Sequence, residues 1–325
     1  MKKGFALLCL LALLLPLPGL ILKGPDVFSE DRNENVNAAL GFRGEITAVS
    51  AAFQQLLGMS GSDQVALGKN GVLYLAETLP EAVGQTELTD REIEAIAGRI
   101  KALDDALREK GAYLVFLCAP NKASVMKDAL PYYARPRQGP GGLDRLQSRL
   151  AEMGVRYVDV KGMALETPET AYLLTDTHWT DAFAHRVYKA LMAQLPDAAW
   201  RDYGDLPLEK SRRLGDLTEL IYSRGGPKEE VLQREVPRAY RVKGAMRTVM
   251  DMKIETACEA NGLRVIVLRD SFANALFPYL ANNIGSLRLI RSHHWLDSYW
   301  QEGTDAVVLE IVERNLPMLM EAHEE

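Results

Sequence analysis

Residues 263–272, LRVIVLRDSF, consist of an apolar segment followed closely by a serine, Ser271. The segment 263–268 is short, rich in β-branched residues and preceded by Asn261-Gly262, a composition that predicts a buried strand. Beyond it, apolar side chains recur at helical spacing. Ser271 is therefore expected at a strand-to-helix turn, where backbone N–H groups at a helix N-terminus would stabilise developing negative charge. A plain helix-capping role for Ser271 is the alternative.

A partner for this serine lies about 90 residues upstream, in Asp176-Thr177-His178. A serine hydroxyl is a poor nucleophile until a base takes its proton, and the base needs an acceptor on its other ring nitrogen. Asp176 and His178 can supply acceptor and base from one loop, and Thr180 is expected to cap the helix that follows. The pattern predicts a triad of Ser271, His178 and Asp176. A capped loop with a structural histidine is the alternative.

The two segments together resemble a known family. Residues 176–180, DTHWT, resemble the signature of the alginate O-acetyltransferase family and the related DHHW proteins, and residues 269–272, RDSF, resemble their nucleophile block. Many members have a glycine where this chain has Arg269, whereas the DHHW branch has an arginine, which weakens the case for alginate as the polymer. Further matches between about residues 65 and 320 are GKNGVLY at 68–74, Pro120-Asn121-Lys122, Gly215-Asp216-Leu217, DAVVLE at 305–310 and Glu313-Arg314.

The expected fold is an SGNH-hydrolase-like, flavodoxin-like α/β domain. Strands and helices alternate, which predicts a parallel sheet covered by helices on both faces. Only the charged interval 196–262 breaks the alternation, and we expect an insertion or lid there. The expected strands are 112–118, 155–160, 263–269, 287–291 and 306–312, and the expected helices are 89–110, 142–153, 181–195, 272–284 and 295–302. Domain boundaries are expected at 1–23 (membrane anchor or signal peptide), 24–64 (linker and packing helix) and 65–325 (catalytic domain).

The N-terminus predicts the compartment. Lys2-Lys3 precede 19 apolar residues, 4–22, a length that just suffices to span a bilayer, and the lysines keep the N-terminus inside. A cleaved signal peptide is the alternative. With 47% hydrophobic residues and a net charge of −6, the rest of the chain can fold as an exported domain, and it has no basic run for nucleic acid. We expect an extracytoplasmic domain on the cytoplasmic membrane, in the periplasm or at the cell surface.

Four further residues are candidates for binding. Asn274, one turn past Ser271, is a candidate amide donor to an oxyanion. Arg291 follows a predicted strand and is a candidate for binding the polysaccharide or the oxyanion, with a solvated arginine as the alternative. The resemblance alone nominates Lys122 for binding substrate or oxyanion, and a structural role is the alternative. Trp179 is a candidate for stacking on a sugar ring, and a core aromatic that fixes the His178 loop is the alternative.

Metal and disulfide sites are not predicted. A zinc site from His178, His293 and His294 lacks a convincing ligand set. Cys118, in a predicted strand, and Cys258, in a predicted helical stretch, are expected to be buried free thiols, although an oxidising compartment would permit them to pair. No cofactor is expected.

The residues and the resemblance together imply a serine-dependent O-acetyltransferase that modifies an exopolysaccharide or another envelope glycan. Its implied partners are the polysaccharide acceptor and a membrane-bound O-acyltransferase that supplies acetyl groups. A carbohydrate acetylesterase with the same triad is one alternative, because hydrolysis and transfer pass through the same acyl-enzyme. A non-catalytic glycan-binding or assembly protein is the other.

Overall fold

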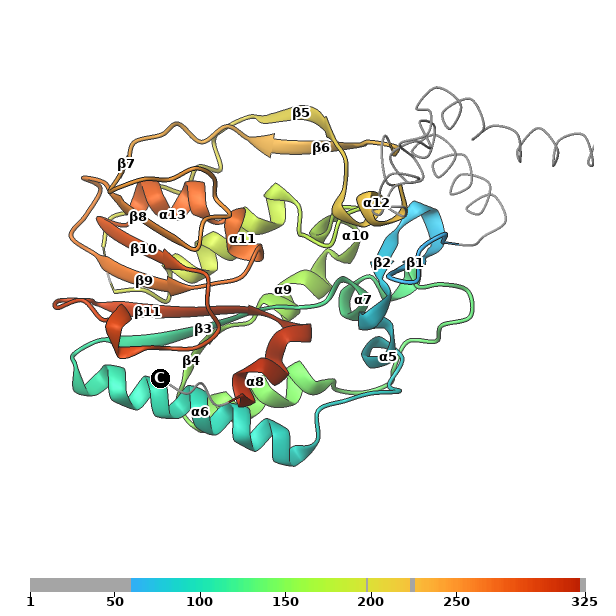
Figure 1. Cartoon of the computed structure of the whole chain (residues 1–325), viewed down its shortest axis with the longest axis horizontal. Helices are drawn as coiled ribbons and strands as arrows, with labels where there is room; N and C mark the ends of the chain where they lie inside the picture. The colour runs from blue at the N-terminus through green and yellow to red at the C-terminus, as the bar shows by residue number, and fades with distance from the viewer. Residues whose placement is uncertain (1–59, 197, 223–225, 322–325) are drawn as a thin grey trace, which may run out of the picture.

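The computed structural model describes residues 60–321, except 197 and 223–225 (Figure 1). A seven-stranded sheet in the order β4-β3-β11-β9-β10-β8-β7 lies at its centre, with two separate hairpins, β1-β2 and β5-β6. The strands are β1 (Val65–Leu67), β2 (Leu73–Leu75), β3 (Tyr113–Ala119), β4 (Arg156–Val158), β5 (Leu208–Arg213), β6 (Glu229–Arg234), β7 (Arg241–Val242), β8 (Lys253–Ala257), β9 (Arg264–Leu268), β10 (Ser286–Ile290) and β11 (Ala306–Val312). The α-helices are α5 (Leu79–Ala82), α6 (Asp90–Glu109), α7 (Lys122–Val125), α8 (Gly142–Glu152), α9 (Val160–Glu166), α10 (Pro168–Ala171), α11 (Asp181–Met192), α12 (Asp216–Ile221) and α13 (Phe277–Asn283). The 3₁₀ helices are η2 (Lys69–Gly71), η3 (Ala76–Thr78), η4 (Lys127–Ala129), η5 (Phe272–Asn274), η6 (Asp297–Tyr299) and η7 (Glu313–Met320).

The sheet is mixed. Strands β4, β3, β11, β9 and β10 are parallel, as the alternation of strands and helices predicts. The expected parallel sheet is wrong at one edge, where β8 pairs antiparallel with β10 and β7 pairs antiparallel with β8. The reason lies in the interval 196–262, which contributes β8 without a crossover helix. Along β8 buried residues alternate with exposed or half-buried ones, a pattern typical of an antiparallel strand with one covered face.

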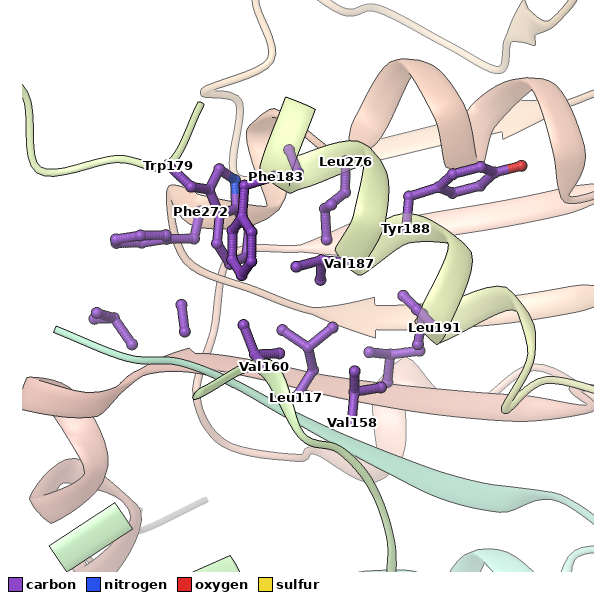
Figure 2. Packing of buried hydrophobic residues seen from close by; sticks show 14 of the residues in the cluster. Leu117, Val158, Val160, Trp179, Phe183, Val187, Tyr188, Leu191, Phe272 and Leu276 are labelled. Carbon is purple, nitrogen blue, oxygen red and sulfur yellow. The ribbon is translucent and has the colours of Figure 1, made fainter. Parts of the chain in front are cut away.

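Helices cover both faces of the sheet. On one face, α6, α8 and η7 pack against alternate residues of the strands, such as Phe116 and Leu309. On the other face, α11 and α13 pack against residues that include Leu117, Val267 and Val308. Figure 2 shows part of this second layer, with Val187 and Leu191 of α11 above Leu117 and Val158. Because successive strand residues point to opposite faces, one run of apolar residues supplies both cores.

Local signals place several elements correctly. The Thr89 side chain accepts from the Glu92 backbone in a capping box at the start of α6, and Thr180 caps α11 by accepting from Phe183. The predicted helix 272–284 is wrong in part, because it is divided into η5 and α13. Pro278 lies in the first turn of α13, where its missing N–H breaks no hydrogen bond. The helix expected at 295–302 is only the three residues of η6.

The interval 196–262 holds the β5-β6 hairpin, α12, β7 and β8. The hairpin lies at the top of Figure 1, and the division of the chain into domains stays a prediction. The predicted anchor or signal peptide, 1–23, and residues 24–59 of the predicted linker lie outside the described residues. Among the helices that the structure describes, none combines the length and apolar character needed to cross a bilayer.

Cys118 and Cys258 are free thiols, as expected. Cys118 lies inside β3, and burial raises the pKa of its thiol, which keeps it protonated and unreactive. Cys258 follows β8, and its sulfur lies 3.2 Å from the carbonyl oxygen of Ile284.

A substitution at Leu117 tests how much the packing between the sheet and α11 contributes to stability. Its side chain is fully buried between β3 and this helix layer, so Leu117→Ala should lower the free energy of unfolding by about 2–5 kcal/mol. Leu165→Ala, at a position 43% exposed on α9, is the matched control and should change it by about 0.5 kcal/mol or less. Urea unfolding measures both. Equal effects of the two substitutions would contradict this packing.

Candidate active site

A cleft of about 410 Å³ opens beside the carboxyl end of β9. Its lining comes from four parts of the chain that are far apart in sequence: the loop before α11 with the start of that helix, the β5-β6 hairpin, the segment before β8, and the residues after β9. This is the edge of an α/β sheet where ligands usually bind. The lining residues are Leu173, His178, Trp179, Asp181, Arg213, Val231, Leu232, Gln233, Val249, Met250, Ser271, Asn274, Ala275 and Pro278.

Ser271 lies in this cleft, and its Oγ is 2.8 Å from Nε2 of His178. The helix-capping alternative is wrong, because the Ser271 side chain makes no capping hydrogen bond. Ser271 does lie at the N-terminus of a helical element, as expected, but that element is the single 3₁₀ turn η5 and not an α-helix. Among the described residues, no acceptor takes the backbone N–H of Ser271, which is therefore available to an oxyanion in the cleft.

The loop between α10 and α11 brings His178 to the serine. Asp176 is 1% exposed, and its Oδ1 accepts from the backbone N–H of His178 at 2.9 Å and from the ring Nδ1 at 2.7 Å. Its Oδ2 accepts from Arg213 at 3.2 Å and from the backbone N–H of Asp216 at 3.3 Å. Because the carboxylate accepts a hydrogen bond from Nδ1–H, the proton of the neutral imidazole stays on Nδ1, and Nε2 is free to accept from Ser271. The structure thus brings the three predicted residues together, with His178 hydrogen-bonded to Asp176 on one ring nitrogen and to Ser271 on the other.

The same contacts set the protonation of the pair. Burial alone raises the pKa of Asp176, but hydrogen bonds from His178 and the charges of His178 and Arg213 outweigh it and lower that pKa to about 2. Burial alone lowers the pKa of His178, but hydrogen bonds and charge from Asp176 and Asp216 raise it to about 9. The site therefore stabilises the imidazolium, the form in which a base holds a proton taken from Ser271.

Asp216 is the residue that the sequence patterns left without a role. Its Oδ2 lies 3.4 Å from Nδ1 of His178, and its carboxylate accepts from the backbone N–H and the hydroxyl of Thr177. Gly215 permits this close approach, since a Cβ there would lie 2.1 Å from the carbonyl oxygen of Thr175. The Gly-Asp-Leu match was a signal for this position. The match alone could not show that Asp216 faces the histidine.

Lys122 does not line the cleft. The predicted contact with substrate or oxyanion is therefore wrong, and the structural interpretation fits this residue. The side chain is 6% exposed, and Nζ donates to the carbonyl oxygens of Leu73, Leu174 and Asp176 at 2.8, 2.8 and 2.9 Å. Burial lowers the pKa of Lys122 to about 7. Three donors meet three acceptors, so the ammonium ties the His178 loop to the β1-β2 hairpin.

The other candidates differ in where they lie. Asn274 lines the cleft with Ser271. Trp179 borders the cleft but is 2% exposed and packs edge-on against Phe272 at 5.0 Å, so the core interpretation fits it and the sugar-stacking interpretation does not. Figure 2 shows Trp179 and Phe272 together at the end of the α11 layer. Arg291 is not among the cleft residues, and its guanidinium donates to the carbonyl of Met250, which does line the cleft.

The zinc ligands considered from sequence are not brought together. Among the described residues, the group close enough to hold a metal is Asp176, His178 and Asp216, with ligand atoms within 4.8 Å of one another. The oxygens of this group already accept from N–H groups, and Arg213 adds a positive charge beside Asp176. Carboxylates held in this way are suited to orienting the His178 ring and not to binding a metal ion. His293 and His294 follow β10 and do not belong to the group.

Residues 65–256 match the family model described as SGNH hydrolase-like domain, acetyltransferase AlgX. The chain belongs to this family. The family resemblance of the sequence motifs is therefore confirmed, and so is the SGNH-hydrolase-like α/β fold.

Solved structures with this fold are also similar to the chain. PatB1 of Bacillus cereus, solved with a sulfonyl adduct, is 16% identical with a TM-score of 0.58, over 78% of this chain and 94% of that one. The O-acetyltransferase domain of Pseudomonas putida AlgJ is 19% identical with a TM-score of 0.52, over 78% and 92%. At these identities the likeness shows a shared fold. No curated protein sequence matches the chain significantly.

A titration of His178 tests the two-carboxylate arrangement. Asp216→Asn removes one of the charges that raise the pKa of His178, so the midpoint of the imidazole titration, followed by NMR, should move from about 9 toward lower pH. Glu230→Gln, at an exposed carboxylate of the β5-β6 hairpin that pairs with Lys210, is the control and should leave the midpoint in place. An unchanged midpoint in Asp216→Asn would show that this carboxylate does not act on the ring.

Proposed function

We propose that the protein is an O-acetyltransferase that modifies an extracytoplasmic polysaccharide through an acetyl-enzyme on Ser271. The observation that carries the proposal is the 2.8 Å contact between His178 Nε2 and Ser271 Oγ, with Asp176 on the other ring nitrogen. Nucleophile, base and orienting acid are thus within hydrogen-bond reach of one another, as serine catalysis requires. Family membership supports acetyl as the group transferred.

In the first half-reaction, His178 Nε2 takes the Ser271 proton while Oγ attacks the carbonyl carbon of an acetyl ester. The backbone N–H of Ser271 and the Asn274 amide are the proposed donors to the oxyanion. The tetrahedral intermediate then breaks its bond to the donor oxygen, which leaves as an alcohol with the proton from His178. Asp176 stays ionised and stabilises the imidazolium that forms between the two proton transfers.

In the second half-reaction, a glycan hydroxyl gives its proton to His178 and attacks the acetyl carbon. The bond to Ser271 breaks, and its Oγ regains the proton. Water in place of the glycan would give the acetylesterase reaction. We infer transfer because the family is described by an acetyltransferase. The paired and buried site residues argue against a non-catalytic scaffold, since an unused buried carboxylate such as Asp176 is expensive to keep.

The acetyl supplier and the compartment are part of the proposal. One short apolar segment, 4–22, gives the chain no route of its own for acetyl groups across a membrane, so a membrane-bound O-acyltransferase is the proposed supplier. The same segment would hold the catalytic domain near that partner, on the outer face of the cytoplasmic membrane.

Kinetics with an activated acetyl ester test the nucleophile and the base. Ser271→Ala and His178→Ala should each lower kcat/KM by about 10³-fold or more, and the double variant should be little worse, because such residues act as a unit. Ser148→Ala, on the exposed face of α8, is the control and should keep the wild-type rate. Undiminished turnover in folded Ser271→Ala would exclude the proposed nucleophile.

Glycan acetyl content separates transfer from hydrolysis. Deleting the gene should lower the acetyl content of a surface glycan, and wild-type protein but not Ser271→Ala should restore it. Replacing residues 1–23 with a cleaved export signal should also lower glycan acetylation while the released domain still hydrolyses the test ester. A rise in acetyl content after deletion would establish the esterase alternative instead.

A further inference from the structure

Arg269 is a fully buried cation directly before Asp270 and Ser271. Among the described residues, no carboxylate forms an ion pair with its guanidinium. Its Nη1 donates to Asn274 Oδ1 at 2.6 Å and to the carbonyl of Asp270 at 3.3 Å. Its Nη2 donates to the carbonyls of Val249 and Asp251 at 2.7 and 2.9 Å. Its Nε has no hydrogen-bond partner in the part of the chain that the structure describes. A charge this deep is expensive to bury, so the contacts that Nη1 and Nη2 do make hold their acceptors firmly in place.

The contact with Arg269 fixes which way the Asn274 amide faces. A guanidinium can only donate, so the atom 2.6 Å from it must be the amide oxygen. The NH₂ group therefore lies on the other side, where Nδ2 is 3.0 Å from the sulfur of Met250, a weak acceptor. Asn274, Met250 and Ser271 line the same cleft. The amide thus presents a weakly engaged donor at the cleft of the nucleophile.

The guanidinium of Arg269 also binds the segment 249–251, which precedes β8. Val249 and Met250 line the cleft, and the carbonyls of Val249 and Asp251 accept from Arg269. Arg291 contacts the same segment, where its guanidinium donates to the carbonyl of Met250 and its backbone N–H donates to the carbonyl of Met252. Met250 is therefore kept beside the Asn274 amide by backbone contacts on both sides.

We propose that Arg269 is a positioning residue that acts through Asn274, fixing the amide so that its NH₂ group donates to the oxyanion formed on the acetyl carbon at Ser271. The inference rests on the proposed function. A hydrogen bond from a cation to the amide oxygen also polarises the amide and makes its N–H groups better donors. Lysine cannot replace this arginine, because a single ammonium cannot span Asn274 and the 249–251 carbonyls in the fork geometry of a guanidinium.

A double-mutant cycle tests the proposal, with the rate of the acetylation burst from an activated acetyl ester as the readout. Asn274→Ala should slow the burst by about 10²-fold, the usual effect of losing one oxyanion donor. Arg269→Lys should also slow it, and the double variant should be no slower than Asn274→Ala alone. Arg288→Lys, at a largely buried arginine on β10 whose side chain is 13% exposed, is the control and should keep the wild-type burst. Multiplying effects of the two substitutions would overturn the proposal.

Asn274→Asp keeps the proposal testable if Arg269→Lys does not fold. The aspartate keeps an oxygen against Arg269 and loses the NH₂ group, so its burst should be as slow as that of Asn274→Ala. A wild-type burst would overturn the proposal. Ser271→Ala, measured in parallel, identifies which claim fails. If Ser271→Ala keeps the burst, the proposed function is wrong; if it has none while the cycle is multiplicative, only the role of Arg269 is wrong.

Discussion

The carboxylate of Asp176 is the constraint on which the site depends. It is almost fully buried, so its two oxygens must be satisfied by protein donors. The backbone and ring of His178 supply two, and Arg213 and the backbone of Asp216 supply two more. These donors come from the loop before α11, the β5-β6 hairpin and α12. Satisfying one buried charge thus fixes three segments, and through the imidazole it fixes the position of Ser271 Oγ.

Two neighbouring cations complete this arrangement without touching the proposed reaction. Lys122 donates to carbonyls of the Asp176 loop, and Arg269 donates to Asn274 and to carbonyls of the 249–251 segment; neither side chain lines the cleft. Both donate mainly to backbone carbonyls, so each locates main chain and leaves the cleft itself free. The raised pKa of His178 follows from the acidic side of the same network, where Asp176 and Asp216 both face the ring.

Local sequence patterns were sufficient for the strand before Ser271, the Asp-x-His loop and the cap of α11, because each depends on neighbours in the chain. They were insufficient for β8, which pairs with β10 about 30 residues later and runs antiparallel to it. Asp216 and Lys122 were visible as motif residues. Their roles depend on contacts with Thr177 and Leu174 across 39 and 52 positions, which no periodicity encodes.

Mass spectrometry of the acetyl-enzyme tests the central claim most directly. The intact domain is mixed rapidly with an activated acetyl ester, quenched in acid and digested. The account predicts one added acetyl group, on the peptide that contains Ser271, formed faster than steady-state turnover, and none at that position in His178→Ala over the same time. Turnover of the ester with no acetyl group on Ser271, or with the group on another residue, would contradict it.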